Sequence, residues 1–304
     1  MQVIVKGNFM KNTKALLSIL FVLVINSFFV SSVAAKSSVW KVSRGNDFVY
    51  IAGTIHILPP SEFPLPSEFQ QAYKATNTLV FETKLPDESD MTAQVQMMQA
   101  MMYNNGQSLK SVLSRRTYQQ LKGHVSALGA DLAMFELFKP GALVSMLAML
   151  EAQKAQLSGE GVDVYFNKKA VADNKAISYL ESVEFQMNML ANMGKGHEDK
   201  FIKSNLKQMK DFKAMFIKLI AAWRRGDTAK LTKLAIEPMQ DDPKSMKTML
   251  TDRNRNWLPL IEGMFADNGK HIDKEFVLVG VAHLVGEGNV LALLKRKGYR
   301  VEQL

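Results

Sequence analysis

The sequence predicts an α/β (α+β) fold, with a central sheet built from both ends of the chain and a large helical insertion over about residues 87–275. Short apolar runs typical of strands lie near both ends of the chain, at 39–42, 48–51, 78–81, 276–279 and 299–301. Between them, apolar residues recur mainly at spacings of three and four, which is typical of helices. No internal repeat or low-complexity linker interrupts the chain, so one domain accounts for it.

Residues 1–35 resemble a Sec-type secretory signal peptide. Two lysines precede an apolar stretch over 15–30, and small residues at 33–35 offer a cleavage site. The stretch is shorter than the roughly 20 apolar residues of a spanning helix, which favours cleavage over a permanent anchor. With Met10 as the expected start, we predict a periplasmic or secreted protein whose mature part, 36–304, is a single domain.

The expected elements follow in chain order. The first two strands flank Arg44-Gly45-Asn46-Asp47, whose turn-forming residues predict a β-hairpin. The helical pattern begins near Asp87 and is broken by Pro140-Gly141. Further elements are expected downstream: a strand at 177–180, helices at 182–193 and 200–223, a strand at 276–279, a helix at 289–297 and a strand at 299–301.

Composition excludes several classes of site. The 304 residues include no cysteine, which excludes disulfides, Cys-ligated metal centres and a thiol nucleophile. Any metal must therefore be held by histidine, carboxylate or carbonyl groups, and there are only five histidines. The net charge of +9 falls to +6 without residues 1–35, which contain three lysines and no acidic residue.

The remaining basic excess is concentrated at 195–233, which holds 11 Lys+Arg residues against four acidic ones. Apolar residues at helical spacing accompany them, so this stretch predicts either peripheral contact with anionic lipid or the solvated outer face of packed helices. No nucleic-acid-binding motif is present, and an exported protein is not expected to meet nucleic acid.

Two Gly-x-x-His motifs, Gly53 to His56 and Gly280 to His283, each follow an apolar strand. Open α/β sheets bind ligands beyond the carboxyl ends of their strands, so both imidazoles should lie at one edge of the sheet. Two further strand-like runs end in carboxylates, at Glu82 and Glu181. Two histidines with one or two carboxylates suit a divalent first-row ion such as Mn, Co, Fe or Zn.

Together these motifs resemble the TraB/GumN family, whose eukaryotic relatives include the Tiki membrane proteases. The matching text is ordered along the chain from about 38 to 304: Gly53-Thr54-Ile55-His56, Val80-Phe81-Glu82, Gly161-Val162-Asp163, Leu180-Glu181 followed by Gln186, Asp252-Arg253-Asn254 before Trp257, and Gly280-Val281-Ala282-His283. The resemblance implies a metal-dependent peptidase, with Mn or Co as the usual ion, on a fold related to erythromycin esterase and ChaN-like proteins.

By this resemblance, His56 and His283 would hold the metal or act on the substrate, and Glu82 would be the general base. Glu181, at the end of its strand-like run, is a further expected metal ligand. Arg253 would clamp a substrate carboxylate or stabilise an oxyanion, because a planar guanidinium suits both, and the neighbouring Asn254 would bind substrate. The expected partner is a peptide or protein substrate. The alternative is a periplasmic haem-, metal- or peptide-binding protein without catalysis.

Overall fold

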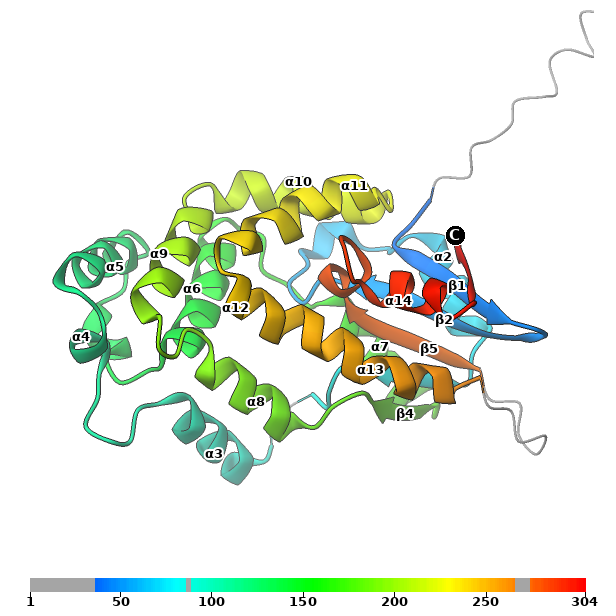
Figure 1. Cartoon of the computed structure of the whole chain (residues 1–304), viewed down its shortest axis with the longest axis horizontal. Helices are drawn as coiled ribbons and strands as arrows, with labels where there is room; N and C mark the ends of the chain where they lie inside the picture. The colour runs from blue at the N-terminus through cyan, green and yellow to red at the C-terminus, as the bar shows by residue number, and fades with distance from the viewer. Residues whose placement is uncertain (1–35, 86–88, 266–273) are drawn as a thin grey trace, which may run out of the picture. The chain divides into compact units, whose positions relative to one another are not determined.

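The structure is a computed structural model of the whole chain, and it describes residues 36–85, 89–265 and 274–304. Lys36 to Leu304 form one compact unit. The predicted signal peptide lies outside the described residues and stays a prediction. Figure 1 shows the helices and strands of the described part.

A six-stranded mixed sheet, in the order β4-β3-β5-β2-β1-β6, lies at the centre of the described chain. Its strands are β1 (Val39–Arg44), β2 (Asp47–Thr54), β3 (Thr78–Phe81), β4 (Ala176–Tyr179), β5 (Glu275–Gly280) and β6 (Arg300–Gln303). The four strands β4, β3, β5 and β2 are parallel; β1 pairs antiparallel with β2, and β6 pairs antiparallel with β1 at the edge of the sheet. The mixed α/β fold class is therefore confirmed, and the ChaN-like assignment stays a prediction.

Both ends of the described chain contribute to this sheet. β1 and β2 form a hairpin in which Arg44 pairs with Asp47, and Gly45 takes a positive φ of 61° in the two-residue turn between them. β6 then pairs with β1, and β5 inserts between β2 and β3. The sheet therefore joins segments more than 200 residues apart, as the strand-like runs predicted.

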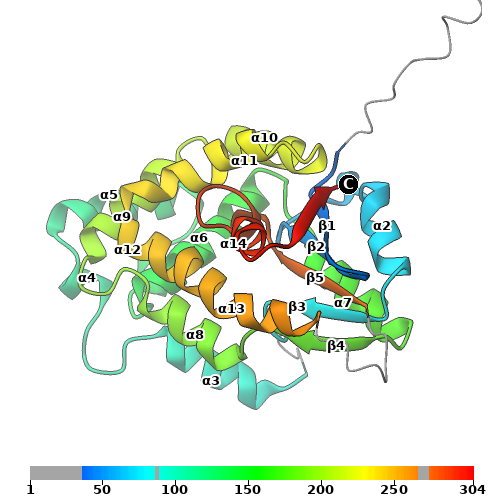
Figure 2. The same ribbon diagram turned by 45° about the vertical axis from the view of Figure 1, so that its right-hand side comes forward.

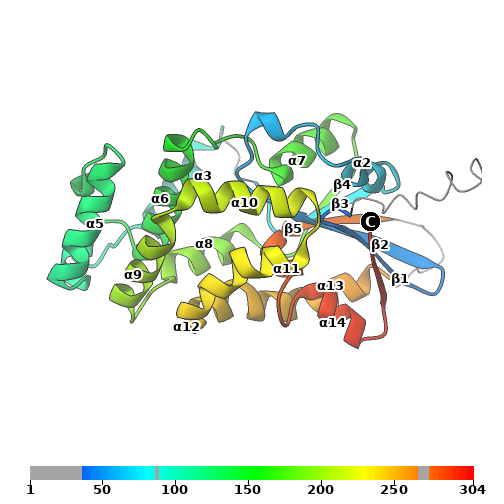
Figure 3. The ribbon, with the colours of Figure 1, turned by 90° about the horizontal axis from the view of Figure 1, so that it is seen from above.

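Helices cover both faces of the sheet. They are α2 (Ser67–Lys74), α3 (Met91–Met101), α4 (Leu109–Val112), α5 (Arg115–Ala127), α6 (Pro140–Lys154), α7 (Val162–Ala172), α8 (Val183–Asn192), α9 (Glu198–Met209), α10 (Phe212–Arg224), α11 (Thr228–Leu231), α12 (Pro243–Met246), α13 (Asp252–Gly263) and α14 (Val290–Arg296). Figure 3 shows α2 and α7 on one side of the strands and α13 and α14 on the other. Strand residues alternate between the two cores, so that Phe276 packs with α2 and α7 whereas Val277 packs with α13 and α14.

The expected helix over 200–223 is interrupted at Lys210 and Asp211, which separate α9 from α10. The apolar residues of both helices are largely buried, including Phe201 in one core cluster and Trp223 in another. Their basic side chains therefore form an outer face, and contact with anionic lipid stays a prediction. No helix of the described residues is long and apolar enough to span a membrane.

Candidate functional site

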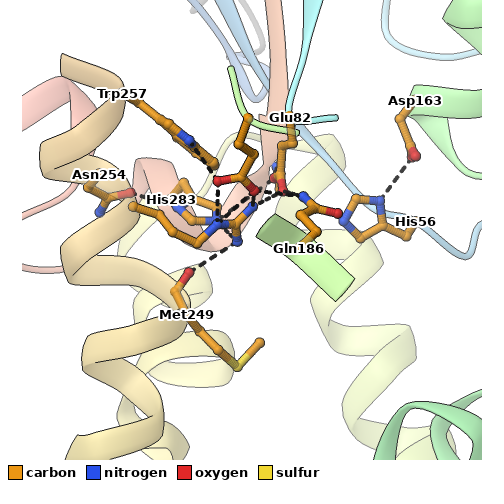
Figure 4. Close-up of polar contacts among 11 residues, drawn as sticks. His56, Glu82, Asp163, Gln186, Met249, Asn254, Trp257 and His283 are labelled. Atoms are coloured by element: carbon orange, nitrogen blue, oxygen red, sulfur yellow. Dashed lines mark hydrogen bonds and ion pairs between the residues drawn. The ribbon is translucent and has the colours of Figure 1, made fainter. Parts of the chain in front are cut away.

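Four parallel strands end side by side and place polar residues at one edge of the sheet. These residues are His56 after β2, Glu82 after β3, Glu181 after β4 and His283 after β5. The register brings Thr54 opposite Gly280, so the two Gly-x-x-His motifs are neighbours. Figure 4 shows Glu82 between the two imidazoles.

Arg253, in the first turn of α13, joins three of these side chains. Its Nη2 donates to Glu82 Oε2 and Glu181 Oε1, each at 2.5 Å, and its Nη1 donates to His283 Nε2 at 3.0 Å. The guanidinium is only 5% exposed and lies over the ring of Trp257. A buried cation therefore offsets two buried carboxylates, and its planar fork fixes their positions.

A π-helical turn over Lys247–Thr251 delivers Arg253 to this position. The Asp252 amide bonds the carbonyl five residues back instead of four, and Arg253 Nη1 also donates to the Met249 carbonyl at 3.1 Å. Such a turn is common at functional sites, and periodicity alone did not predict it.

His283 is held as a neutral imidazole with a defined tautomer. A guanidinium can only donate, so Nε2 accepts from Arg253 and the proton must reside on Nδ1. That proton is donated to Asn254 Oδ1 at 2.6 Å. Burial, Arg253 and His56 lower the pKa of His283 to about 3 despite the nearby Glu82 carboxylate. Asn254 is 3% exposed and orients His283 in the structure.

His56 is in a different environment, with 61% of its side chain exposed. Its Nδ1 lies 3.1 Å from Asp163 Oδ1. Desolvation by the pocket walls opposes charge on the ring, but Asp163 and then Glu82 raise the pKa of His56 to about 9. Water screens part of this attraction because the ring is exposed.

Asp163 reaches His56 because α7 begins against the loop after β2. The Val162 amide donates to the Ile55 carbonyl at 3.1 Å. A Cβ on Gly161 would lie 2.4 Å from the His56 carbonyl oxygen, so only glycine permits this approach.

Glu82 is almost fully buried and remains ionised. Its Oε1 accepts from the Gly280 amide at 2.6 Å, and its Oε2 accepts from Arg253 and, at 3.2 Å, from Gln186 Nε2. Burial disfavours the charge, but His283, Arg253, His56 and the Gly280 amide together lower the pKa of Glu82 to about 2.

Two of the candidate metal ligands, His56 and His283, and the candidate base Glu82 surround one small space at Gly280. A Cβ at position 280 would lie 3.2 Å from Glu82 Oε1, 3.8 Å from His56 Nε2 and 3.7 Å from His283 Cδ2. Asp163 contacts Nδ1 of His56, and Asn254 contacts Nδ1 of His283. Metal-binding histidines usually have such a partner on the ring nitrogen that does not bind the metal. In type and orientation these side chains fit a divalent first-row ion.

The set is not assembled as a ready-made metal centre. Among the residues that the structure describes, no group of three or more His, Asp or Glu side chains could hold an ion as they stand. Arg253 occupies His283 Nε2, and Glu181 accepts from Arg253, Gln186 and Trp257. Binding an ion would require Nη1 of Arg253 to leave His283, and Glu181 is engaged as a partner of Arg253.

A cavity of about 400 Å³ opens beside His56, Glu82 and Arg253. Two buried hydroxyl oxygens in its lining, Thr54 Oγ1 and Thr83 Oγ1, have no hydrogen-bond partner within the described part of the chain. Buried hydroxyls without partners are costly, and both oxygens lie beneath the surface of the cavity.

Asp163 and Gln186 also belong to the cavity, and neither was assigned a role from the sequence. Both stand in matched motif text, Gly161-Val162-Asp163 and the segment after Glu181, and that position was the available signal.

Two known proteins show distant similarity to this chain. The chain is 22% identical to metalloprotease TIKI2 of Danio rerio over 325 aligned positions, which cover 90% of this chain but only 62% of that relative. It is 23% identical to the uncharacterized protein YbaP of Escherichia coli (strain K12), over 83% of this chain and 89% of YbaP. No solved structure matches significantly. The model of the TraB/PrgY/gumN family matches residues 38–303, and the chain belongs to that family.

Proposed function

We propose that this protein is an exported, metal-dependent hydrolase that cleaves peptide bonds at the edge formed by β2, β3 and β5. The observation that carries the proposal is the convergence of His56 Nε2, Glu82 Oε1 and the His283 ring around Gly280. Membership of the family and the distant metalloprotease relative support a hydrolase. The proposed substrate is a peptide or protein.

His56 and His283 would hold the ion, with Mn or Co expected first and Zn or Fe as alternatives. The chemistry supplied by such an ion is Lewis acidity, which lowers the pKa of water and polarises a carbonyl oxygen. Glu82, ionised above a pKa of about 2, borders the same space and would accept a proton from water at Oε1. Glu181 is assigned to holding Arg253 rather than to the ion.

Arg253 and Asn254 are assigned positioning roles. Every N–H of the Arg253 guanidinium already faces a carboxylate, a carbonyl or His283, so its role is to hold Glu82 in place. Asn254 fixes the tautomer of His283, which leaves Nε2 as an acceptor, and in the structure that lone pair accepts from Arg253.

The first test is metal affinity measured by calorimetry on the mature protein. His56→Ala and His283→Ala should each weaken Mn²⁺ or Co²⁺ binding by about tenfold or more. Gly280→Ala should do the same, because the new Cβ enters the space between the ligands. Gly263→Ala, with nothing within 4 Å of the added Cβ, is the matched control and should bind normally. Equal affinity in all five proteins would contradict the proposed site.

The second test is turnover of a peptide library. The wild-type protein should cleave peptides, whereas the Glu82→Gln variant should fold normally and cleave none. Binding of peptide or haem without any turnover would instead favour the non-catalytic alternative, with a Soret band as the signature of haem. Mass spectrometry of protein recovered from the periplasm tests export, and the expected N-terminus is Lys36.

A further inference from the structure

A second cavity, of about 520 Å³, lies between α3 and α8, and we call it the α3–α8 groove. Figures 1 and 2 both show these two helices side by side. One wall carries Ala93, Met97 and Ala100, which share a face of α3, and the other carries Val183 and Met187 of α8. Polar side chains, including Gln94, Gln96 and Glu184, lie among these apolar ones in the lining. The flexible methionines can adapt to varied ligands.

The groove adjoins the candidate site. Lys84 and Leu85, which continue the chain after Glu82, line both the groove and the cavity of the site. α8 separates the two spaces, with Gln186 facing the site and Met187 facing the groove. A ligand bound at Glu82 could therefore extend past Lys84 and Leu85 into the groove.

An extended polypeptide can occupy both spaces at once. Lys84 and Leu85 belong to both linings, so a chain bound at Glu82 can place one side chain in the groove, whereas a compact small molecule would not reach both.

α3 is suited to moving aside for a ligand. None of its residues is buried, and Met91 and Met98 expose 67% and 52% of their surfaces. Its C-terminal end is tied by the Lys139 ammonium, which donates to the Ala100 carbonyl at 2.7 Å. A helix that buries so little surface has low local stability, so the width of the groove can adjust.

We propose that the α3–α8 groove binds a large apolar side chain of an extended polypeptide substrate whose scissile bond lies at Glu82. This inference rests on the proposed peptidase function and assigns it a specificity: cleavage at a fixed distance from an apolar residue. Apolar pockets of this kind discriminate by roughly 10- to 200-fold.

The test uses the mature Glu82→Gln protein, which should bind peptides without cleaving them. Two labelled peptides differ only in whether one position holds Phe or Ser, and that position is moved along the peptide. Fluorescence anisotropy should show about tenfold tighter binding of the Phe peptide at one position. Met97→Asp should remove this preference, whereas the neighbouring Met98→Asp, outside the groove, should retain it.

Ala93→Trp, which fills the groove without adding charge, is a second variant, and thermal melting verifies that each protein folds. Equal binding by the Met97 and Met98 variants, or equal binding of Phe and Ser peptides at every position, would overturn the inference. Failure of the proposed function looks different: Met97-dependent binding would persist, but the wild-type protein would cleave neither peptide.

Discussion

Replacing Arg253 with methionine should lower the free energy of unfolding by about 3–5 kcal/mol at neutral pH, because two carboxylates would stay buried without their cation. The side chains of Glu82 and Glu181 are 11% and 7% exposed, and that of Arg253 is 5% exposed. Methionine preserves much of the volume, so the loss reports on charge and hydrogen bonding rather than on a cavity.

The size of the expected loss in the free energy of unfolding follows from the hydrogen bonds that the Arg253 guanidinium donates. Nε and Nη2 bond Glu181, Nη2 also bonds Glu82, and Nη1 bonds the Met249 carbonyl and His283. Without Arg253, two buried carboxyl groups lose a hydrogen-bonded cation, which places the cost well above the effect of an exposed ion pair. Protonation of a carboxylate limits the loss, since a neutral acid is cheaper to bury.

The loss should depend on pH in a defined direction. Arg253 contributes to lowering the pKa of Glu82 to about 2, so in the wild type Glu82 stabilises the fold above its ordinary pKa of 4.5, and this stability is lost as pH falls through about 2. In the methionine variant, the pKa of Glu82 should be higher than in the wild type, because one of the charges that oppose the effect of burial is gone. The difference between the two proteins should therefore be largest near neutral pH and shrink in acid.

Urea unfolding at several pH values between about 2 and about 8 measures this difference. Arg255→Met, an exposed position on the same helix, is the matched control and should change stability by less than about 0.5 kcal/mol. A loss under about 1 kcal/mol for the Arg253 variant at neutral pH, or one independent of pH, would refute the assignment of Arg253 as the partner of both carboxylates.

Two other substitutions test neighbouring features. Gly53→Ala should destabilise the fold by about 1–3 kcal/mol in thermal or urea unfolding, because its Cβ would lie 2.7 Å from Val281 Cγ2, and a neutral effect would disprove this packing. Asp163→Asn should lower the pKa of His56 in the metal-free protein from about 9, as followed by NMR. The interaction that raises the pKa of His56 stabilises the fold fully below pH 6.5, and this stabilisation is lost as pH rises through about 9. The asparagine variant should therefore have a lower free energy of unfolding than the wild type at pH 6 and the same one above pH 9. An unshifted His56 titration would count against the contact.

The strands and their polar ends could be read from the sequence because each signal is local. An apolar run followed at once by His56, Glu82 or His283 needs no knowledge of distant residues, and parallel strands bring their ends to one edge. The network around Arg253 is different in kind. Its partners Glu181 and Glu82 lie 72 and 171 residues away, and no spacing rule connects them. The guanidinium was therefore expected to face a substrate, whereas the structure places it among carboxylates.

The two Gly-x-x-His motifs use their glycines for different reasons, and together those reasons make one unit. Gly53 has no room for a side chain because Val281, from the second motif, packs against it. Gly280 lies opposite Thr54 in the neighbouring strand, and its amide donates to Glu82. The missing side chain there leaves the space that both imidazoles border. Gly53 therefore lets the second motif pack against the first. Gly280 leaves open the space at which the two histidines meet.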